Sequence, residues 1–455
     1  MNLDPVKKLM YEQDFTAAEK LLQKGLKTEK DKFMIFYFLG LVHFELRNLD
    51  KSIQFFEKSL NLRPNNISVY IKLAVLYQTM GDTESSKNNY LKSIELDSNQ
   101  IRSYYGLYQL KPKFLKDEYY DKIKNISLHA KENSTDLAIS KFLLSKFEIT
   151  KKNLKKELTL LEDAHKTIFN ANLQYNRESD FYYKKIMQKF HNKIEYLNLD
   201  NSDKQKYTKP IFIIGLPRTG STLIESIIST ANNNYLSFGE SSFFHMGILE
   251  QIKKKNLFNN ENYFNVNIIE LDLKEFKEYL YKRYSQFSPL ENENEKEIID
   301  KSLDNFFNIE TILKVFPDAK IINSTRNIYD NIIAIYEKLL AKLSWAHTIK
   351  DILDYIDIYL RIMDYYKKKY PQNIITISLE SLNNDKYKET KKIFEFCDLN
   401  WNEEIFEFHK RDNLYIKTSS NVQLRTGIQS YDYNKYKRYY SLFENYKKNY
   451  DWLKN

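Results

Sequence analysis

The chain of 455 residues has few of the residues that mark several protein classes. Its single cysteine, Cys397, excludes a disulfide framework and a cysteine-rich metal site. Nine glycines and eight prolines exclude a collagen-like or linker-dominated chain. No run of about 18 apolar residues occurs, and no apolar segment follows a basic cluster at the N-terminus, so we expect neither a membrane span nor a signal peptide. The sequence therefore predicts a soluble protein in a reducing compartment, the cytoplasm.

The charge and the apolar content narrow the class further. Lys and Arg total 70 against 61 Asp and Glu, a net charge of +9 that suits an anionic ligand. These charges alternate along the chain and form no block, which argues against nucleic-acid binding. Hydrophobic residues make up 42% and aromatic residues 15%, so the chain can bury a sizeable core. Its length exceeds one ordinary core, so we expect two domains or a domain with a repeat array. The richness in Lys, Asn, Ile and Tyr is typical of an AT-rich bacterial genome.

The N-terminal part of the sequence repeats itself with a constant spacing. A lysine, a small residue and an aliphatic residue recur in that order at 24–26, 58–60 and 92–94. Small residues also recur at Ala18, Ser52 and Ser86, and in a further phase at Gly40 and Ala74. A period of about 34 residues predicts a helix-turn-helix unit, which buries its apolar face only by stacking on its neighbours. The period resembles the tetratricopeptide repeat over about 8–108, although no repeat carries the family's tryptophan.

We expect residues 1–110 to form these repeats and residues 111–206 to form a helical cap and connector. The connector is rich in lysine, and its apolar residues keep a helical spacing at Ile139, Phe142 and Leu143. The array either serves as a scaffold or presents a concave surface that binds the acceptor or a partner protein. The sequence leaves both roles open.

A different pattern begins at Pro210. The run 211–214 is continuously apolar, as expected for a strand that is buried on both faces of a parallel sheet. Gly-Leu-Pro-Arg-Thr-Gly-Ser-Thr follows at 215–222, and a helical pattern of apolar residues comes next at 223–228. A glycine-bounded loop between a strand and a helix binds anions through its backbone N–H groups. Arg218, Ser221 and Thr222 would add side-chain donors to this predicted anion site.

The loop departs from the loop of nucleotide triphosphatases. Ser221 follows the second glycine where those enzymes have a lysine, and the cation comes early, as Arg218. Such an enzyme also needs a carboxylate that holds Mg²⁺ at the end of a neighbouring strand, and only Asp300 offers one. An Mg-ATP-dependent kinase is therefore the weaker alternative.

Several further segments, taken in chain order with this loop, carry a family resemblance. They are 299–306, 315–322, 325–327, 370–371, 379–382, 396–401, 419–425 and 434–436. Over about 207–445 the sequence resembles the sulfotransferases, above all tyrosylprotein sulfotransferases and bacterial repeat-fused relatives. The resemblance implies an α/β sulfotransferase domain over 207–455, P-loop-like, with a central parallel sheet. It also implies 3′-phosphoadenosine 5′-phosphosulfate as the sulfuryl donor and a hydroxyl group as the acceptor.

The resemblance implies a role for each matching residue that contacts the donor. The 5′-phosphosulfate would be held by Arg218, Thr219, Gly220, Ser221 and Thr222, and the 3′-phosphate by Arg326, for which a guanidinium fork is well shaped. Lys338 keeps a positive charge one helical turn beyond position 334, and Lys435 matches the later donor contact, with Ser419, Asn421 and Arg425 as less certain companions. Ala334 stands where the family has a serine and Leu379 where relatives have a tyrosine, which puts donor affinity in doubt.

The catalytic roles that the resemblance implies fall on three residues. Lys301 occupies the position of the lysine that follows charge onto the bridging oxygen, and Ser420 occupies the second stabilising position. Glu240, in a Gly-Glu pair, would take the proton of the acceptor hydroxyl. His245 and His347 are the alternative bases. No metal cluster is seen in the sequence, and sulfuryl transfer needs none.

Two questions stay open at the level of sequence. The resemblance to tyrosylprotein sulfotransferases points to a protein tyrosine as the acceptor, but a glycan, a lipid or a small hydroxylated metabolite fits the site residues equally well. The changes at Ala334 and Leu379 also favour, slightly, a repeat scaffold with a degenerate and inactive transferase domain. Relatives of this kind often dimerise, but no segment of the sequence identifies a homodimer interface.

Overall fold

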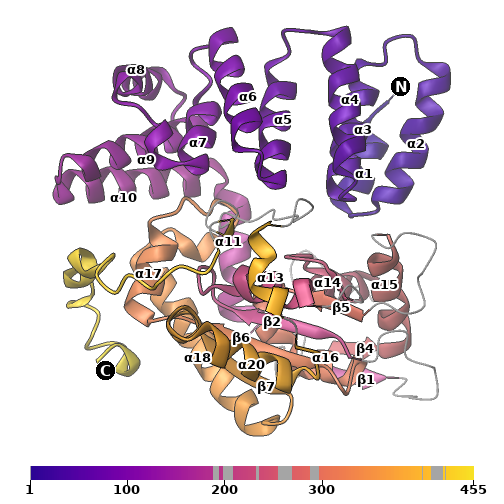
Figure 1. Cartoon of the computed structure of the whole chain (residues 1–455), viewed down its shortest axis with the longest axis vertical. Coiled ribbons are helices and arrows are strands. Elements are labelled where there is room, and N and C mark those ends of the chain that lie inside the picture. The colour runs from indigo at the N-terminus through magenta and orange to yellow at the C-terminus, as the bar shows by residue number, and fades with distance from the viewer. Residues whose placement is uncertain are drawn as a thin grey trace. The chain divides into compact units, whose positions relative to one another are not determined.

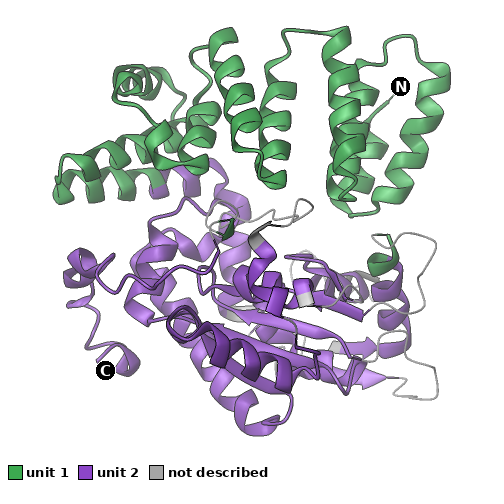
Figure 2. Cartoon of the chain, viewed as in Figure 1, with its two compact units in different colours: residues 1–164, 283–289, 409–426 green, residues 165–282, 290–408, 427–455 purple. Residues whose placement is uncertain are grey.

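The computed structural model describes residues 2–187, 194–197, 209–231, 235–254, 269–286, 297–401, 403–410, 424–425 and 427–454. The chain divides into two compact units (Figure 2). Unit 1 comprises residues 1–164, 283–289 and 409–426, and unit 2 comprises residues 165–282, 290–408 and 427–455. The main division, after Ala164, falls inside the predicted connector 111–206, and the domain limits at 110 and 206 stay predictions.

Unit 1 is built of helices that follow one another along the chain (Figure 1). They are α1 (Asp4–Tyr11), α2 (Phe15–Thr28), α3 (Phe33–Glu45), α4 (Leu49–Leu62), α5 (Ile67–Met80), α6 (Thr83–Leu96), α7 (Ile101–Leu110), α8 (Tyr120–His129), α9 (Thr135–Thr150) and α10 (Leu154–Ala171), which continues into unit 2. Helices α2, α5 and α6 are capped at their N-termini by the side chains of Asp14, Asn66 and Asp82. Each side chain accepts a hydrogen bond from the backbone N–H three residues further on.

The predicted repeat period reappears in the hydrogen bonds between helices. Ser52 Oγ donates to the carbonyl of Gly40 at 2.7 Å, and Ser86 Oγ, one period later, donates to the carbonyl of Ala74 at 2.7 Å. The small residues let paired helices approach closely, because a Cβ at position 40 would lie 2.6 Å from the ring of Phe56. The predicted helical repeat array is thereby confirmed.

Unit 2 contains a five-stranded parallel sheet with the strand order β3-β5-β2-β6-β7 (Figure 1). Its strands are β2 (Ile211–Gly215), β3 (Tyr235–Ser237), β5 (Glu297–Asp300), β6 (Lys320–Thr325) and β7 (Ile374–Ser378). A two-stranded parallel sheet pairs β1 (Ile194–Leu197) with β4 (Ile269–Asp272). The α-helices wholly or mainly in this unit are α11 (Leu173–Phe181), α13 (Ser221–Ala231), α14 (Phe243–Lys254), α15 (Leu273–Ser285), α16 (Ile309–Val315), α17 (Ile328–Tyr336), α18 (Ile349–Lys369), α19 (Leu379–Asn384) and α20 (Lys386–Phe396).

The central strand β2 explains why the sequence predicted a sheet covered on both faces. All five of its residues are buried, and Ile211 pairs with Ile299 of β5 on one side and with Lys320 of β6 on the other. Because parallel strands end at the same edge of a sheet, the residues that follow β5, β2 and β6 come to one place. The predicted α/β fold with a central parallel sheet is confirmed. Among the described residues, no helix is both long and apolar enough to cross a membrane.

Candidate active site

The loop 216–220, which joins β2 to α13, is held by side chains from neighbouring elements. Thr219 Oγ1 donates to the carbonyl of Leu216 at 2.7 Å, and Ser324 Oγ of β6 donates to the carbonyl of Thr219 at 2.8 Å. Asn331 Nδ2 of α17 donates to the carbonyl of Pro217 at 2.8 Å. With these carbonyls fixed toward the protein, the loop leads into the N-terminus of α13, a position that favours anions.

The backbone of this loop is left-handed at two positions. Arg218 has φ +70° and Gly220 has φ +88°. Position 220 favours glycine, because a side chain there would strain the left-handed backbone and its Cβ would lie 2.6 Å from Cδ1 of Leu379. A left-handed conformation is uncommon for a residue other than glycine.

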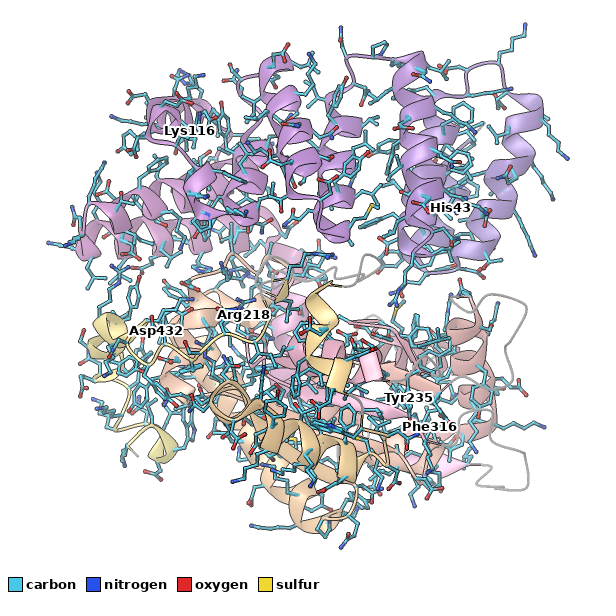
Figure 3. All side chains as sticks on the ribbon, viewed as in Figure 1. His43, Lys116, Arg218, Tyr235, Phe316 and Asp432 are labelled. Carbon is cyan, nitrogen blue, oxygen red and sulfur yellow. The ribbon has the colours of Figure 1, made fainter. Side chains whose placement is uncertain are left out.

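Arg218, labelled in Figure 3, belongs to a charged neighbourhood that the loop shares with α17 and the C-terminal segment. Burial lowers the pKa of the Arg218 guanidinium, which the attraction of Tyr436 and Glu337 partly offsets. Ser221 and Thr222 are the first residues of α13, and both are buried. The structure thus brings the loop cation and the predicted hydroxyl donors to the same helix end.

Lys301, the residue after β5, forms an ion pair with Glu240, which lies in the loop after β3. Lys301 Nζ donates to Glu240 Oε1 at 2.9 Å. The lysine side chain has 0% exposure, whereas the Glu240 side chain is 56% exposed. The pairing follows from the sheet, because the N–H of Lys301 also donates to the carbonyl of Gly239 at 3.0 Å. The two residues predicted to be base and stabilising cation therefore lie side by side.

Glu225 of α13 is a second carboxylate at this ammonium, and sequence reasoning missed it. Its Oε2 lies 3.7 Å from Lys301 Nζ, and its Oε1 accepts a hydrogen bond from Ser237 Oγ. Burial acts to lower the pKa of Lys301, but Glu240 and Glu225 outweigh it, so the pKa is raised. The available signal was an acid within the helical pattern of apolar residues at 223–228.

The carboxylate of Asp300, the acid that an Mg-ATP enzyme would need, is hydrogen-bonded to neighbouring groups of the protein. Its side chain is buried and accepts hydrogen bonds from Ser241 Oγ at 2.9 Å and from the N–H of Ser302 at 2.9 Å. These bonds fix the turn that presents Glu240. Among the described residues, no group of three or more His, Cys, Asp or Glu could hold a metal ion.

Arg326, which follows β6, is bonded to the loop and to the C-terminal segment. Its Nη1 donates to the carbonyl of Arg218 at 3.3 Å, and its Nε donates to Tyr431 Oη at 2.8 Å. Asp330 of α17 lies 4.0 Å from its Nη2. The two predicted phosphate-binding arginines are therefore directly connected, while Asp330 and Tyr431 are further neighbours that the sequence reasoning did not name.

The remaining candidates are placed less directly. Tyr436 Oη donates to Glu337 Oε1 at 2.8 Å, which brings together the segments that carry Lys435 and Lys338. The sequence predicted that Lys338 would lie one helical turn beyond position 334. Helix α17 ends at Tyr336, however, so Lys338 lies just beyond the helix. Ser420, with Ser419 and Asn421, lies outside the described residues.

The alternative bases are both engaged with other rings. His245 Nδ1 lies 3.3 Å from Tyr182 Oη, and His347 Nδ1 lies 3.1 Å from His165 Nδ1. Burial lowers the pKa of each of the two candidate histidines to about 4. By contrast, burial and the charge of Glu240 raise the pKa of Asp304, in the turn after Lys301, to about 6.

A cavity of about 400 Å³ lies at the carboxyl ends of β2 and β6, with Thr219, Arg326 and Asn331 among its lining residues. Open parallel sheets bind their ligands at this edge. The edge thus combines a cavity, a glycine-bounded loop at the start of a helix, two arginines and a lysine–glutamate pair.

Comparison with known families agrees with this arrangement. The sulfotransferase family model matches residues 210–403, which include the loop, Glu240, Lys301 and Arg326, and tetratricopeptide-repeat models match residues 33–66 and 67–100. The chain carries a sulfotransferase-family domain preceded by tetratricopeptide repeats. The predicted resemblance to both families is confirmed, and the sulfotransferase match supports sulfuryl transfer as the general reaction. Kinship with the tyrosylprotein branch stays a prediction.

Comparison with individual proteins gives one sequence match and several similar solved structures. An uncharacterized protein of Aquifex aeolicus (strain VF5) is 28% identical over 237 residues, which are 51% of this chain and 31% of that protein. The match spans only about a third of that relative. Similar solved structures are the sulfotransferase domain of the Synechococcus PCC 7002 olefin synthase (13% identity, TM-score 0.31, 50% of this chain and 90% of that chain) and a Mycobacterium tuberculosis H37Rv sulfotransferase (12%, 0.32, 72% and 92%).

Proposed function

We propose that unit 2 transfers a sulfuryl group from 3′-phosphoadenosine 5′-phosphosulfate to a hydroxyl of an acceptor. The observation that carries the proposal is that three neighbouring strands deliver complementary groups to one edge. Lys301, which is bonded to Glu240, follows β5, the Arg218 loop follows β2, and Arg326 follows β6. A donor with an anionic group at each end of a nucleoside suits two connected arginines beside a cavity of about 400 Å³.

Each cation has a distinct task in this reaction. Arg218 and the N–H groups at the start of α13 would hold the 5′-phosphosulfate, and Arg326 would hold the 3′-phosphate. Thr219, Gly220, Ser221 and Thr222 would complete the loop, and Lys338 and Lys435 would add positive charge nearby. Charge develops on the sulfuryl oxygens and the leaving phosphate, and Lys301 would stabilise it.

Glu240 would act as the general base. The acceptor oxygen forms the new bond to sulfur, the bond from sulfur to the 5′-phosphate breaks, and the hydroxyl proton passes to the carboxylate. Glu240 suits this role because its side chain is more than half exposed, while one of its two oxygens is bonded to Lys301. Its bond to the lysine also orients the base beside the cation, with no metal required. Ser420 would be a further stabilising residue.

A protein tyrosine is the acceptor that we propose to test first, because the motifs resemble those of tyrosylprotein sulfotransferases. We propose that the repeat array binds the acceptor protein or another protein partner, as helical arrays of this kind present extended concave surfaces. The reaction would take place in the cytoplasm, in a protein that forms a homodimer. A glycan, a lipid or a small hydroxylated metabolite are the other acceptors to include.

Thermal melting of the full chain with 3′-phosphoadenosine 5′-phosphate tests the donor assignment without an acceptor. A ligand at 100 times its Kd stabilises a protein by about 2.7 kcal/mol, which a melting curve resolves easily. We expect the bisphosphate to raise the melting temperature of the wild type and of Arg361→Ala, a control on the exposed side of α18. The shift should vanish in Arg218→Ala.

Two other outcomes would favour the competing functions. A larger shift with Mg-ATP than with the bisphosphate would favour a kinase. The absence of any shift would favour a repeat scaffold with an inactive domain, in line with Ala334, which is fully buried and lacks the hydroxyl that relatives have.

A further inference from the structure

The C-terminal segment 427–440 is bonded to α17 through a single buried carboxylate. Tyr431 Oη donates to Asp330 Oδ2, and Tyr440 Oη donates to Asp330 Oδ1 at 2.6 Å. Asp330 is buried, so two phenols replace the water that its charge would otherwise need. Tyr431 thereby has a fixed position at the edge of the sheet.

Tyr431 also stands between Asp330 and the guanidinium of Arg326. The same phenol oxygen that donates to Asp330 accepts the hydrogen bond of Arg326 Nε, at 2.8 Å. The direct approach of the two charged groups stops at 4.0 Å, between Arg326 Nη2 and Asp330 Oδ2, which is too long for a hydrogen bond. The phenol therefore links the arginine to the aspartate and keeps them apart.

The remaining contacts of Arg326 confine its guanidinium to one orientation. The rings of Tyr431 and Tyr436 each have their centre 5.2 Å from Cζ, within the range of cation–π attraction. Nη1 donates to the carbonyl of Arg218 at 3.3 Å. A guanidinium carries five N–H groups, so with Nε committed to Tyr431 it is the Nη end that remains for a phosphate.

We propose that Tyr431 is a positioning residue that sets the Nη end of Arg326 for the 3′-phosphate of the donor. This inference rests on the proposed function, because it concerns a group that only a 3′-phosphorylated donor carries. Without the phenol, Arg326 would close the short gap to Asp330 and form a direct ion pair. Recognition of the 3′-phosphate thus depends on docking of the C-terminal segment.

The protonation states fit this arrangement. Burial and the bond to Asp330 raise the pKa of Tyr431, so the phenol keeps its proton and its role as donor at neutral pH. Burial acts to lower the pKa of Arg326, but the bond to Tyr431 and the attraction of Asp330 outweigh it. The guanidinium, the phenol and the carboxylate therefore form one chain of charge-assisted hydrogen bonds.

The test compares two nucleotides that differ in the 3′-phosphate alone. Isothermal titration of the full chain would measure the binding of 3′-phosphoadenosine 5′-phosphate and of adenosine 5′-monophosphate. We expect Tyr431→Phe to bind the bisphosphate about tenfold more weakly and the monophosphate as well as the wild type does. The matched control is Tyr433→Phe, because Tyr433 contacts the ring of Tyr431 but its hydroxyl accepts from Asn384 Nδ2, at 2.6 Å. That variant should bind both nucleotides normally.

Three results would overturn the inference. Tyr431→Phe could bind the bisphosphate normally, or it could lose both nucleotides equally, which would indicate a general structural role. A wild type that does not prefer the bisphosphate over the monophosphate would remove the 3′-phosphate site itself, and with it the proposed donor. Should Tyr431→Phe fail to fold, Asp330→Asn tests the same link, since it keeps the size of the side chain and removes the charge that the phenol binds.

Discussion

Replacing Lys301 with methionine tests how the charges of the active site are balanced in the folded protein. The ammonium of Lys301 is fully buried and faces two carboxylates, Glu240 at 2.9 Å and Glu225 at 3.7 Å. Methionine fills a similar volume, so Lys301→Met removes the charge and leaves little cavity. Glu240, with 56% of its side chain exposed, can turn to water, but Glu225, with 11% exposed, cannot.

The expected loss of stability therefore comes mainly from Glu225. Removing one partner of a buried ion pair costs about 3–5 kcal/mol, whereas an exposed pair contributes about 0–1 kcal/mol. For a domain of this size, each kcal/mol lowers the melting temperature by about 2–4 °C, so Lys301→Met should melt about 6–20 °C below the wild type. Glu240→Gln should change the unfolding free energy by less than about 1 kcal/mol.

A double variant separates this charge effect from a packing effect. Thermal melting and urea unfolding without ligand would compare the wild type, Lys301→Met, Glu225→Gln and the double variant. We expect the double variant to recover most of the loss, because it no longer holds an unpaired buried charge, and the coupling between the two sites measures their interaction. The reasoning is refuted if Lys301→Met melts like the wild type or if the double variant is less stable than Lys301→Met.

Further predictions concern the loop, the base and a neighbouring acid. Gly220→Ala should lose about 1–2 kcal/mol of stability, because alanine strains a left-handed backbone and its Cβ would contact Leu379. The variant should also lose its melting shift with the bisphosphate. A titration that shows wild-type affinity would contradict this. Glu240→Gln should lower turnover and leave bisphosphate affinity intact, whereas Arg326→Ala should weaken that affinity by about 2 kcal/mol; equal effects in both assays would remove the assigned roles. The pKa of Asp304 is raised to about 6 from an ordinary 3.8, so its charged form is disfavoured in the fold, and the associated stability is present below pH 3.8 and lost as the pH rises through 6. Between pH 4 and 7, melting curves should therefore show a smaller loss of stability for Asp304→Asn than for the wild type. An equal loss in the two proteins would contradict the assignment.

The features that could be predicted from the sequence are those written in local patterns. The repeat period placed Ser52 and Ser86 at equivalent positions, and the structure gives them equivalent hydrogen bonds. The apolar run of β2, the glycines and the helical spacing after Thr222 together predicted the strand, the loop and α13. Strand-to-loop transitions also indicated where Lys301 would lie.

The features that could not be predicted depend on contacts across the sheet and along the chain. Glu225 meets Lys301 only because α13 and the end of β5 lie beside each other, and nothing in the helical pattern says so. Tyr431 and Asp330 are 101 residues apart. The C-terminal segment that carries Tyr431 has too many tyrosines for the sequence to single one out. The sequence could name the two arginines from their motifs, but not the hydrogen bond between Arg326 and the loop.

The equivalent serine bonds of the repeats bear on how this protein can change in evolution. Ser52 joins α4 to α3 and Ser86 joins α6 to α5 in the same way, one period apart, so the same bond holds the helix pair of each repeat together. Duplication or deletion of one whole repeat would then leave the helix pairs of the other repeats intact, and stability would change by one repeat and one interface at a time. Gene recombination can therefore lengthen or shorten the surface ahead of the sulfotransferase domain in whole units, leaving the sequence of that domain untouched.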